Sequence, residues 1–87
     1  MVSAVVRYTQ HAEARMMERN ISKADVERVL AAPIRQVPAL NGRTESQGWL
    51  ERQGKSLLLR VITEGDLVVL VVTVMATSKF EKYGVVP

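Results

Sequence analysis

The stretch from Leu67 to Ala76 reads LVVLVVTVMA and contains one polar residue, Thr73. β-Branched residues dominate it, and it is about half as long as the ~20 residues that a membrane-spanning helix needs. It therefore predicts a β-strand over about residues 66–76. Because apolar side chains point to both of its faces, both faces must be covered. We expect this strand to hold a central place in a sheet with helices on one side.

The sequence leaves open what covers the second face of this strand. Strict alternation divides its apolar side chains into two sets, Val68, Leu70, Val72 and Val74 on one face and Leu67, Val69, Val71 and Met75 on the other. A chain of 87 residues buries only roughly 60–65% of the surface that its unfolded form exposes. A second subunit or a bound partner is one way to cover the remaining face, and we expect a homodimer. Curling of the sheet, with residues 2–8 and the tail folded over it, is the alternative.

Turn signals divide the rest of the C-terminal part into extended segments. The dipeptides Asn-Gly at 41–42, Gln-Gly at 53–54 and Glu-Gly at 64–65 are typical of tight reversals. They separate segments at residues 34–38, 43–52, 55–63 and 66–76, which predicts a four-stranded antiparallel meander. The β-branched segment Val2–Tyr8 is either an additional short strand or a loose arm.

Two helices are predicted before the sheet. Thr9 offers an N-cap hydroxyl to a helix over about residues 10–19, which lacks glycine and proline. Ser22, with an acidic residue three positions later, has the spacing of a capping box and begins a second helix over about residues 23–32. The fold class is therefore α+β. We expect one domain over residues 1–87, in which a helical hairpin packs on the four-stranded antiparallel sheet.

Composition limits the kinds of site that this chain can form. It has no cysteine, one histidine, 12 Lys and Arg, and 9 Asp and Glu, for a net charge of +3. Disulfides and thiolate metal sites are excluded, and a single histidine cannot hold zinc without carboxylates, so we expect no metal and no cofactor. The mild positive charge favours anionic partners. The N-terminus does not resemble a signal peptide, so a cytoplasmic location away from the membrane is expected.

The only histidine opens a basic ribbon on the first predicted helix. His11, Arg15 and Arg19 follow at steps of four residues, and each step advances only about 40° around a helix. Histidine can take the proton of a ribose 2′-hydroxyl, and arginines can stabilise the charge that develops on phosphorus. The pattern therefore suits RNA cleavage without metal. A solvated helix face on which Arg15 pairs with Glu18 is the alternative interpretation.

The residues of this ribbon belong to a longer motif, H-A-x-x-R-M-x-E-R-x-I-S, which this chain matches at His11, Ala12, Arg15, Met16, Glu18, Arg19, Ile21 and Ser22. The motif resembles the opening of the small family called domain of unknown function 4258, and weaker similarity extends over about residues 8–76. That family resembles RelE- and BrnT-like toxins with a barnase-like nuclease fold. The resemblance implies a ribonuclease toxin that acts on RNA, with an antitoxin protein as a second partner. It also implies His11, Arg15 and Arg19 as catalytic residues.

Three further side chains are candidates for binding RNA. Arg60 interrupts the run LLLRVIT, where an unpaired charge would be costly, so we expect it to reach the rim of the domain, a carboxylate or a phosphate. Lys79 and Tyr83 lie in the tail. Either could protonate the leaving group of the cleavage reaction if the tail folds back over the site.

Two other functions fit the same sequence. The segment RNISKADVERVLAA resembles a helix-turn-helix of the LacI type, with Lys23, Glu27 and Arg28 on a DNA-recognition helix. Against it, such a unit needs a third helix, and the residues that follow are strand-like. The remaining alternative is a non-catalytic protein-binding or dimerisation module, in which the open sheet face binds the partner and the basic ribbon is structural.

Overall fold

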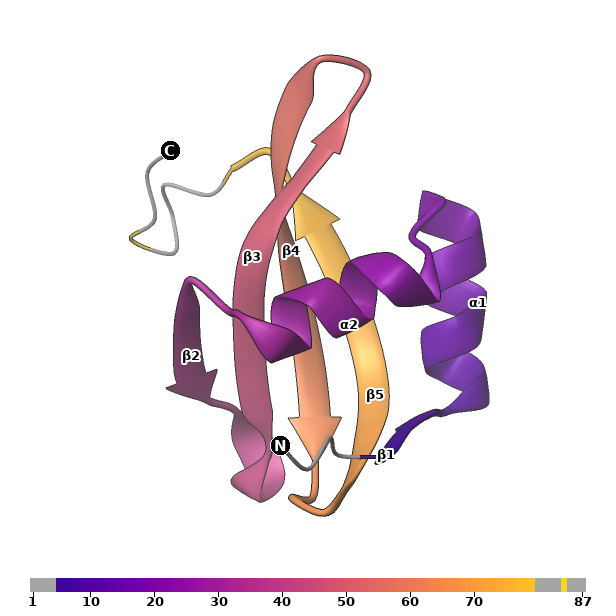
Figure 1. Ribbon diagram of the computed structural model, residues 1–87, viewed down its shortest axis with the longest axis vertical. Helices are drawn as coiled ribbons and strands as arrows, with labels where there is room; N and C mark the ends of the chain where they lie inside the picture. The colour runs from indigo at the N-terminus through magenta and orange to yellow at the C-terminus, as the bar shows by residue number, and fades with distance from the viewer. Residues whose placement is uncertain (1–4, 80–83, 85–87) are drawn as a thin grey trace.

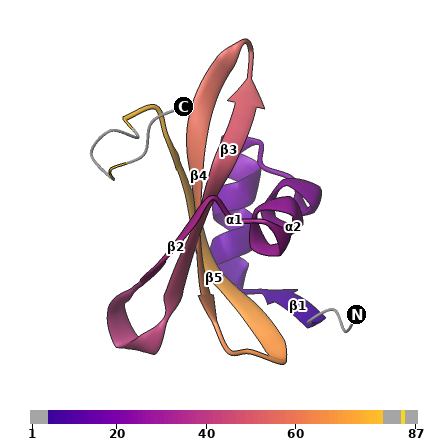
Figure 2. The same ribbon diagram turned by 60° about the vertical axis from the view of Figure 1, so that its left-hand side comes forward.

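The structure, a computed structural model, describes residues 5–79 and Gly84. Two helices pack on one face of a five-stranded sheet with the strand order β1-β5-β4-β3-β2 (Figure 1). The turned view in Figure 2 shows both helices on the same side of the sheet. The predicted α+β class is confirmed. The predicted four-stranded antiparallel sheet is wrong in its details, because a fifth strand joins it and makes the sheet mixed.

The additional strand is β1 (Val5–Tyr8), which pairs in parallel with the first half of β5 (Val68–Thr77). Val5 lies opposite Val68, and Tyr8 lies opposite Val71. The segment that the sequence left open as a strand or an arm is therefore a strand in its second half. Its partner β5 comes last along the chain among the described strands, but it is an interior strand of the sheet, with β1 on one side and β4 on the other.

The other three strands follow the predicted meander. They are β2 (Arg35–Pro38), β3 (Thr44–Arg52) and β4 (Lys55–Glu64), and each pairs antiparallel with the next, as β4 does with β5. A short 3₁₀ turn, η1 (Leu40–Gly42), joins β2 to β3. The turn signals of the sequence therefore fall at the predicted reversals.

Both helices begin at the predicted residues. In α1 (Gln10–Arg19), the Thr9 hydroxyl accepts a hydrogen bond from the N–H of Ala12 at 3.0 Å. In α2 (Lys23–Ala31), Ser22 forms the capping box, and the helix ends one residue earlier than expected. Figure 1 shows α1 running alongside β5 and α2 crossing the sheet. Among the described residues, neither helix is long and apolar enough to cross a membrane.

The core lies between the helices and the sheet, and one irregularity in β5 shapes it. The buried apolar cluster consists of Ala12, Met16, Ile21, Val26, Val29, Leu50, Leu59, Val61, Val71 and Val74. Strict alternation would place Val71 and Val74 on opposite faces of the strand, yet both point into this core. Ile62 pairs with Thr73 and Thr63 pairs with Val71, so Val72 has no partner on β4. This β-bulge shifts the alternation by one residue and corrects the predicted assignment of faces.

The helix-free face of the sheet is covered only in part. Leu58 is fully buried there, and Ile62 is 9% exposed. At the beginning of β5 the expectation of two covered faces is not met, because Leu67 is 84% and Val68 is 49% exposed. The predicted homodimer, which was inferred from the need to cover these side chains, stays a prediction.

The close approach of α2 to β3 at Gly48 generates the first testable prediction. A Cβ atom at this position would lie 2.7 Å from Cγ2 of Val29, which is 2% exposed and belongs to the buried core cluster. We expect Gly48→Ala to lower the free energy of unfolding by roughly 1–3 kcal/mol in urea melts. Adding Val29→Ala should recover part of that loss, because the new methyl group fills space that valine vacates. Strictly additive costs in the double variant would contradict this explanation.

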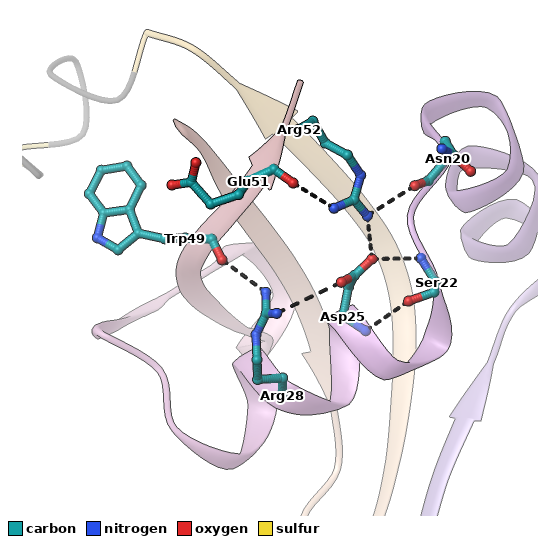
Figure 3. A network of polar contacts seen from close by, with 7 residues as sticks. All are labelled: Asn20, Ser22, Asp25, Arg28, Trp49, Glu51 and Arg52. Atoms are coloured by element: carbon teal, nitrogen blue, oxygen red, sulfur yellow. Dashed lines mark hydrogen bonds and ion pairs between the residues drawn. The ribbon is translucent and has the colours of Figure 1, made fainter. Parts of the chain in front are cut away.

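A polar clamp holds the helical hairpin against the end of β3 (Figure 3). The Arg52 guanidinium donates to the Asp25 carboxylate at 2.5 Å and to the carbonyl oxygen of Asn20 at 3.2 Å. The same carboxylate accepts the backbone N–H of Ser22 at 2.9 Å. One arginine therefore joins the turn between the helices, the beginning of α2 and the sheet. Burial alone would raise the pKa of Asp25, but the hydrogen bonds from Ser22 and Arg52 lower it overall.

This lowered pKa predicts how the clamp depends on pH. A carboxyl group whose pKa is lower in the folded state contributes stability above its unfolded pKa of about 3.9, and loses it as the pH falls through the folded pKa. We expect Asp25→Asn to lower the free energy of unfolding at pH 7 by roughly 1–3 kcal/mol. The deficit should shrink below about pH 4. Urea melts at pH 7 and pH 3 measure it, and equal deficits at both values would show that the charge of Asp25 is not what matters.

Candidate functional site

Thr9 ties the beginning of α1 to the bulged part of β5. Its N–H donates to the carbonyl oxygen of Val71 at 3.1 Å, and its hydroxyl donates to that of Val72 at 2.9 Å. These carbonyl groups lie where β1 ends and the outer edge of β5 loses its neighbouring strand. Backbone groups left without partners in the interior are costly, so Thr9 continues the pairing and fixes the helix at this point.

This anchoring places His11 beside Thr73. The Nε2 atom of the ring lies 3.1 Å from Oγ1 of Thr73, while the histidine side chain remains exposed. Val74 points into the core, so its neighbour Thr73 points toward the helix-free side of the sheet. The imidazole ring therefore lies at the outer edge of β5, on the border between the two faces.

The two arginines of the ribbon lie further along the same helix. At 1.5 Å per residue, Arg15 is about 6 Å and Arg19 about 12 Å beyond His11 along the helix axis. Arg15 approaches Glu18 at 3.4 Å, with 46% and 60% of the two side chains exposed, and such a pair contributes little to stability. No hydrogen bond or ion pair of Arg19 occurs within the described part of the chain. The ribbon is thus one exposed stripe, in which the anticipated pairing of Arg15 with Glu18 is also present.

Two grooves in the described part of the chain lie away from this ribbon. The two grooves are open, with volumes of about 420 and 550 Å³, and they surround the β2–η1 connection at the edge of the sheet formed by β2. Pro38, Ala39 and Arg43 line both. Neither is lined by a residue of the ribbon. In residues 5–79 and at Gly84, no three His, Cys, Asp or Glu side chains gather in a way that could hold a metal ion.

Arg60 lies on the helix-free face and reaches a carboxylate, one of the three surroundings expected for it. Its Nε and Nη2 atoms donate to the two carboxylate oxygens of Glu45, each at 2.8 Å. Gln47 adds a hydrogen bond of 2.6 Å to the same carboxylate. The hydrogen bond from Arg60 lowers the pKa of Glu45 against the opposing effect of burial. The Arg60 side chain is 18% exposed, so its charge is largely committed to this pair.

Of the two tail residues that were expected to bind RNA, the structure describes only Lys79. Lys79 is exposed directly after β5, and its backbone N–H donates to Oγ1 of Thr77 at 3.0 Å. Tyr83 lies outside the described residues. The RNA-binding roles of Arg60, Lys79 and Tyr83 stay predictions.

Sequence reasoning missed the part that Thr73 plays. The available signal was its position as the one polar residue in the run from Leu67 to Ala76. A hydroxyl group in an otherwise apolar strand needs a partner, and the structure supplies His11. The partner could not be identified from the sequence because the two residues are 62 positions apart.

A comparison with models of protein families identifies the relatives of this chain. The model described as Domain of unknown function (DUF4258) matches residues 8–82, which is most of the chain. The chain belongs to the DUF4258 family. The match confirms the resemblance that the His11–Ser22 motif indicated. No curated protein and no solved structure matches. The kinship of this DUF4258 domain with RelE- and BrnT-like toxins therefore stays a prediction.

The pair between Arg60 and Glu45 generates a prediction about stability. Arg60→Ala leaves a carboxylate that is 9% exposed without its cation, and we expect a loss of roughly 3–5 kcal/mol in the free energy of unfolding. Replacing both residues, as Arg60→Met with Glu45→Leu, should restore most of it, because no buried charge remains. Lys79→Ala is the control for an exposed cation and should change the value by less than about 0.5 kcal/mol. If Arg60→Ala is as mild as Lys79→Ala in urea melts, the pair is not structural.

Proposed function

We propose that this DUF4258 domain is a metal-independent ribonuclease of the RelE/BrnT-like kind, or a relative of one, that acts on RNA in the cytoplasm. The α1 ribbon of His11, Arg15 and Arg19 is its site. One observation carries the proposal: an exposed histidine, held at its ring by Thr73, precedes two exposed arginines on the same side of one rigid helix. This arrangement offers a proton acceptor and two phosphate ligands at fixed spacing.

The reaction that these groups support is transfer within the RNA chain. His11 takes the proton from a ribose 2′-hydroxyl, and the 2′-oxygen forms a bond to the adjacent phosphorus. The bond from phosphorus to the 5′-oxygen of the next nucleotide breaks, and that oxygen takes a proton from water. The products are a 2′,3′-cyclic phosphate and a 5′-hydroxyl end. Arg15 and Arg19 stabilise the negative charge that builds up on the phosphoryl oxygens.

The RNA strand has a natural direction along this surface. α1 and β5 run the same way, so the strand would pass from His11 along the ribbon toward the end of β5, where Lys79 is exposed (Figure 1). The net charge of +3 favours such an approach. In this proposal Arg60 supports RNA binding indirectly: its pair with Glu45 holds in place the helix-free face that lies next to the ribbon.

A protein partner is the second candidate function, and a separate surface supports it. Val5, Leu67 and Val68 are exposed and adjacent at the beginning of β1 and β5, where Val5 pairs with Val68. Clustered exposed apolar side chains are typical of protein-binding surfaces. An antitoxin protein or a second copy of the chain could cover them, whether or not the α1 ribbon is catalytic.

The geometry favours the DNA-binding alternative least. Lys23 pairs with Glu13 and lies over the ring of Tyr8, whose hydroxyl donates to Glu27. The Arg28 guanidinium donates to a backbone carbonyl of β3 (Figure 3). Side chains of the would-be recognition helix are thus engaged within the domain, and a strand follows where a third helix is needed.

The ribonuclease proposal is tested with single-residue variants and purified RNA. We expect His11→Ala to lower the cleavage rate by roughly 10²- to 10⁴-fold, because it removes the group that accepts the 2′-hydroxyl proton and the chain has no other histidine. Arg15→Ala should lower the rate by about 10²-fold or more, since it removes a ligand of the charged transition state. Both variants should unfold at the same urea concentration as the wild type, because exposed side chains contribute little to folding.

The matched control is Lys55→Ala, which removes an exposed positive charge from the tip of the β3–β4 hairpin. Its cleavage rate should stay close to that of the wild type. Equal losses in Lys55→Ala and Arg15→Ala would mean that net charge, and not the ribbon, determines activity. Absence of RNA cleavage by the wild-type protein would favour the protein-binding function.

A further inference from the structure

The contact between His11 and Thr73 determines which ring nitrogen is available to a substrate. A neutral imidazole has one protonated nitrogen and one nitrogen with a free lone pair. Nε2 of His11 is occupied by the hydroxyl of Thr73 at 3.1 Å. Nδ1 is therefore the nitrogen that a substrate can reach. In the neutral ring it carries a proton only when Nε2 does not.

Both sides of this contact are held by rigid elements. Thr73 sits in the interior strand β5, paired with Ile62, and its β-branched side chain has few rotamers. His11 sits in the first turn of α1, two residues after the Thr9 anchor. That anchor binds the carbonyl oxygen of Val72, directly before Thr73 in the strand. The Thr9 anchor therefore holds the helix to the strand close to the contact: it lies two residues before His11 in the chain, and it binds the residue directly before Thr73.

The direction of the hydrogen bond follows from what the proposed reaction requires. If the threonine hydroxyl donated to Nε2, the other ring nitrogen, Nδ1, would carry a proton and could accept none. The hydroxyl would also have to turn when the ring became charged. If Nε2–H donates to the Thr73 oxygen, Nδ1 presents a lone pair, and the same hydrogen bond persists in the imidazolium. Proton uptake then needs no rearrangement of the site.

We propose that Thr73 is a positioning residue of the DUF4258 domain, which accepts a hydrogen bond from Nε2–H of His11 and thereby makes Nδ1 the atom that takes the proton of the RNA 2′-hydroxyl. The inference rests on the proposed function for the role of Nδ1. The orientation and tautomer of the ring are properties of the folded protein, and they can be measured without any substrate.

The test is ¹⁵N NMR of the whole protein labelled at histidine, at a pH of about 8.5, where histidine is neutral. The single histidine gives one pair of ring nitrogen signals, so no residue assignment is needed, and the couplings of each nitrogen to the carbon-bound ring protons distinguish Nδ1 from Nε2. We expect the wild type to favour the Nε2–H tautomer more strongly than Thr73→Val does, and Thr73→Ser to keep the wild-type ratio. Thr77→Val, in the same strand, should leave it unchanged. A wild-type ring that is mainly Nδ1–H, or an unchanged ratio in Thr73→Val, would overturn the proposal.

RNA cleavage by the same variants adds the functional readout. Thr73→Val should lower kcat by roughly 10- to 100-fold with little change in KM, because it misplaces the ring without removing a phosphate ligand. Thr73→Ser should restore kcat. An unchanged kcat in Thr73→Val would overturn the positioning role. Loss of the tautomer preference in Thr73→Val, together with full cleavage by His11→Ala, would overturn the proposed ribonuclease site and leave the Thr73 hydrogen bond standing.

Discussion

The packing of α1 on β5 is the interaction on which the rest of this domain depends. Ala12 and Met16 on the helix and Val71 and Val74 on the strand are buried in one cluster, and Ala12 is completely buried. A residue as small as alanine lets the helix come close to the strand. That close packing leaves His11, Arg15 and Arg19 at the border of the apolar contact, where the side chains emerge beside the strand. The position of the ribbon is therefore a consequence of the core.

Polar contacts then fix the helical hairpin at both of its ends. Thr9 joins the first turn of α1 to β5, and Arg52 joins the turn between the helices to β3. Apolar packing is non-directional and leaves a helix free to slide, whereas these hydrogen bonds specify one position. The basic ribbon lies between the two anchors. Its side chains therefore project from a backbone that is held on both sides, which is the condition for a preorganised site.

The sequence predicted well those features that a short segment determines by itself, namely the helix starts and the turns. Thr9 and Ser22 marked the beginnings of the helices because capping is a contact between residues three positions apart. The glycine-containing turns marked the meander for the same reason. The pairing of β1 with β5 was not predicted, because no local signal connects two strands at opposite ends of the chain. The bulge at Val72 was missed too, since an uninterrupted valine-rich run gives no indication of where alternation breaks.

In the candidate site too, local features were predicted and contacts between distant segments were not. The helical period was enough to place His11, Arg15 and Arg19 on one stripe. The partners that determine how these and other side chains behave, Thr73 for His11 and Glu45 for Arg60, depend on strand register. A register that differs by a single residue would turn either partner to the other face. Chemistry carried by one helix was therefore visible in the sequence, and chemistry shared between elements was not.

The separation of 62 residues between His11 and Thr73 has a consequence for synthesis of the chain. A ribosome completes α1 and α2 long before β5 emerges, and until then the apolar side of α1 has no strand to cover it. β1 likewise has no neighbour, because its only partner among the described strands is β5. The growing polypeptide carries every charge of the ribbon but cannot hold the histidine ring in place. Correct positioning of the His11 ring therefore has to wait until β5 is in place, a form of timing that the topology itself provides.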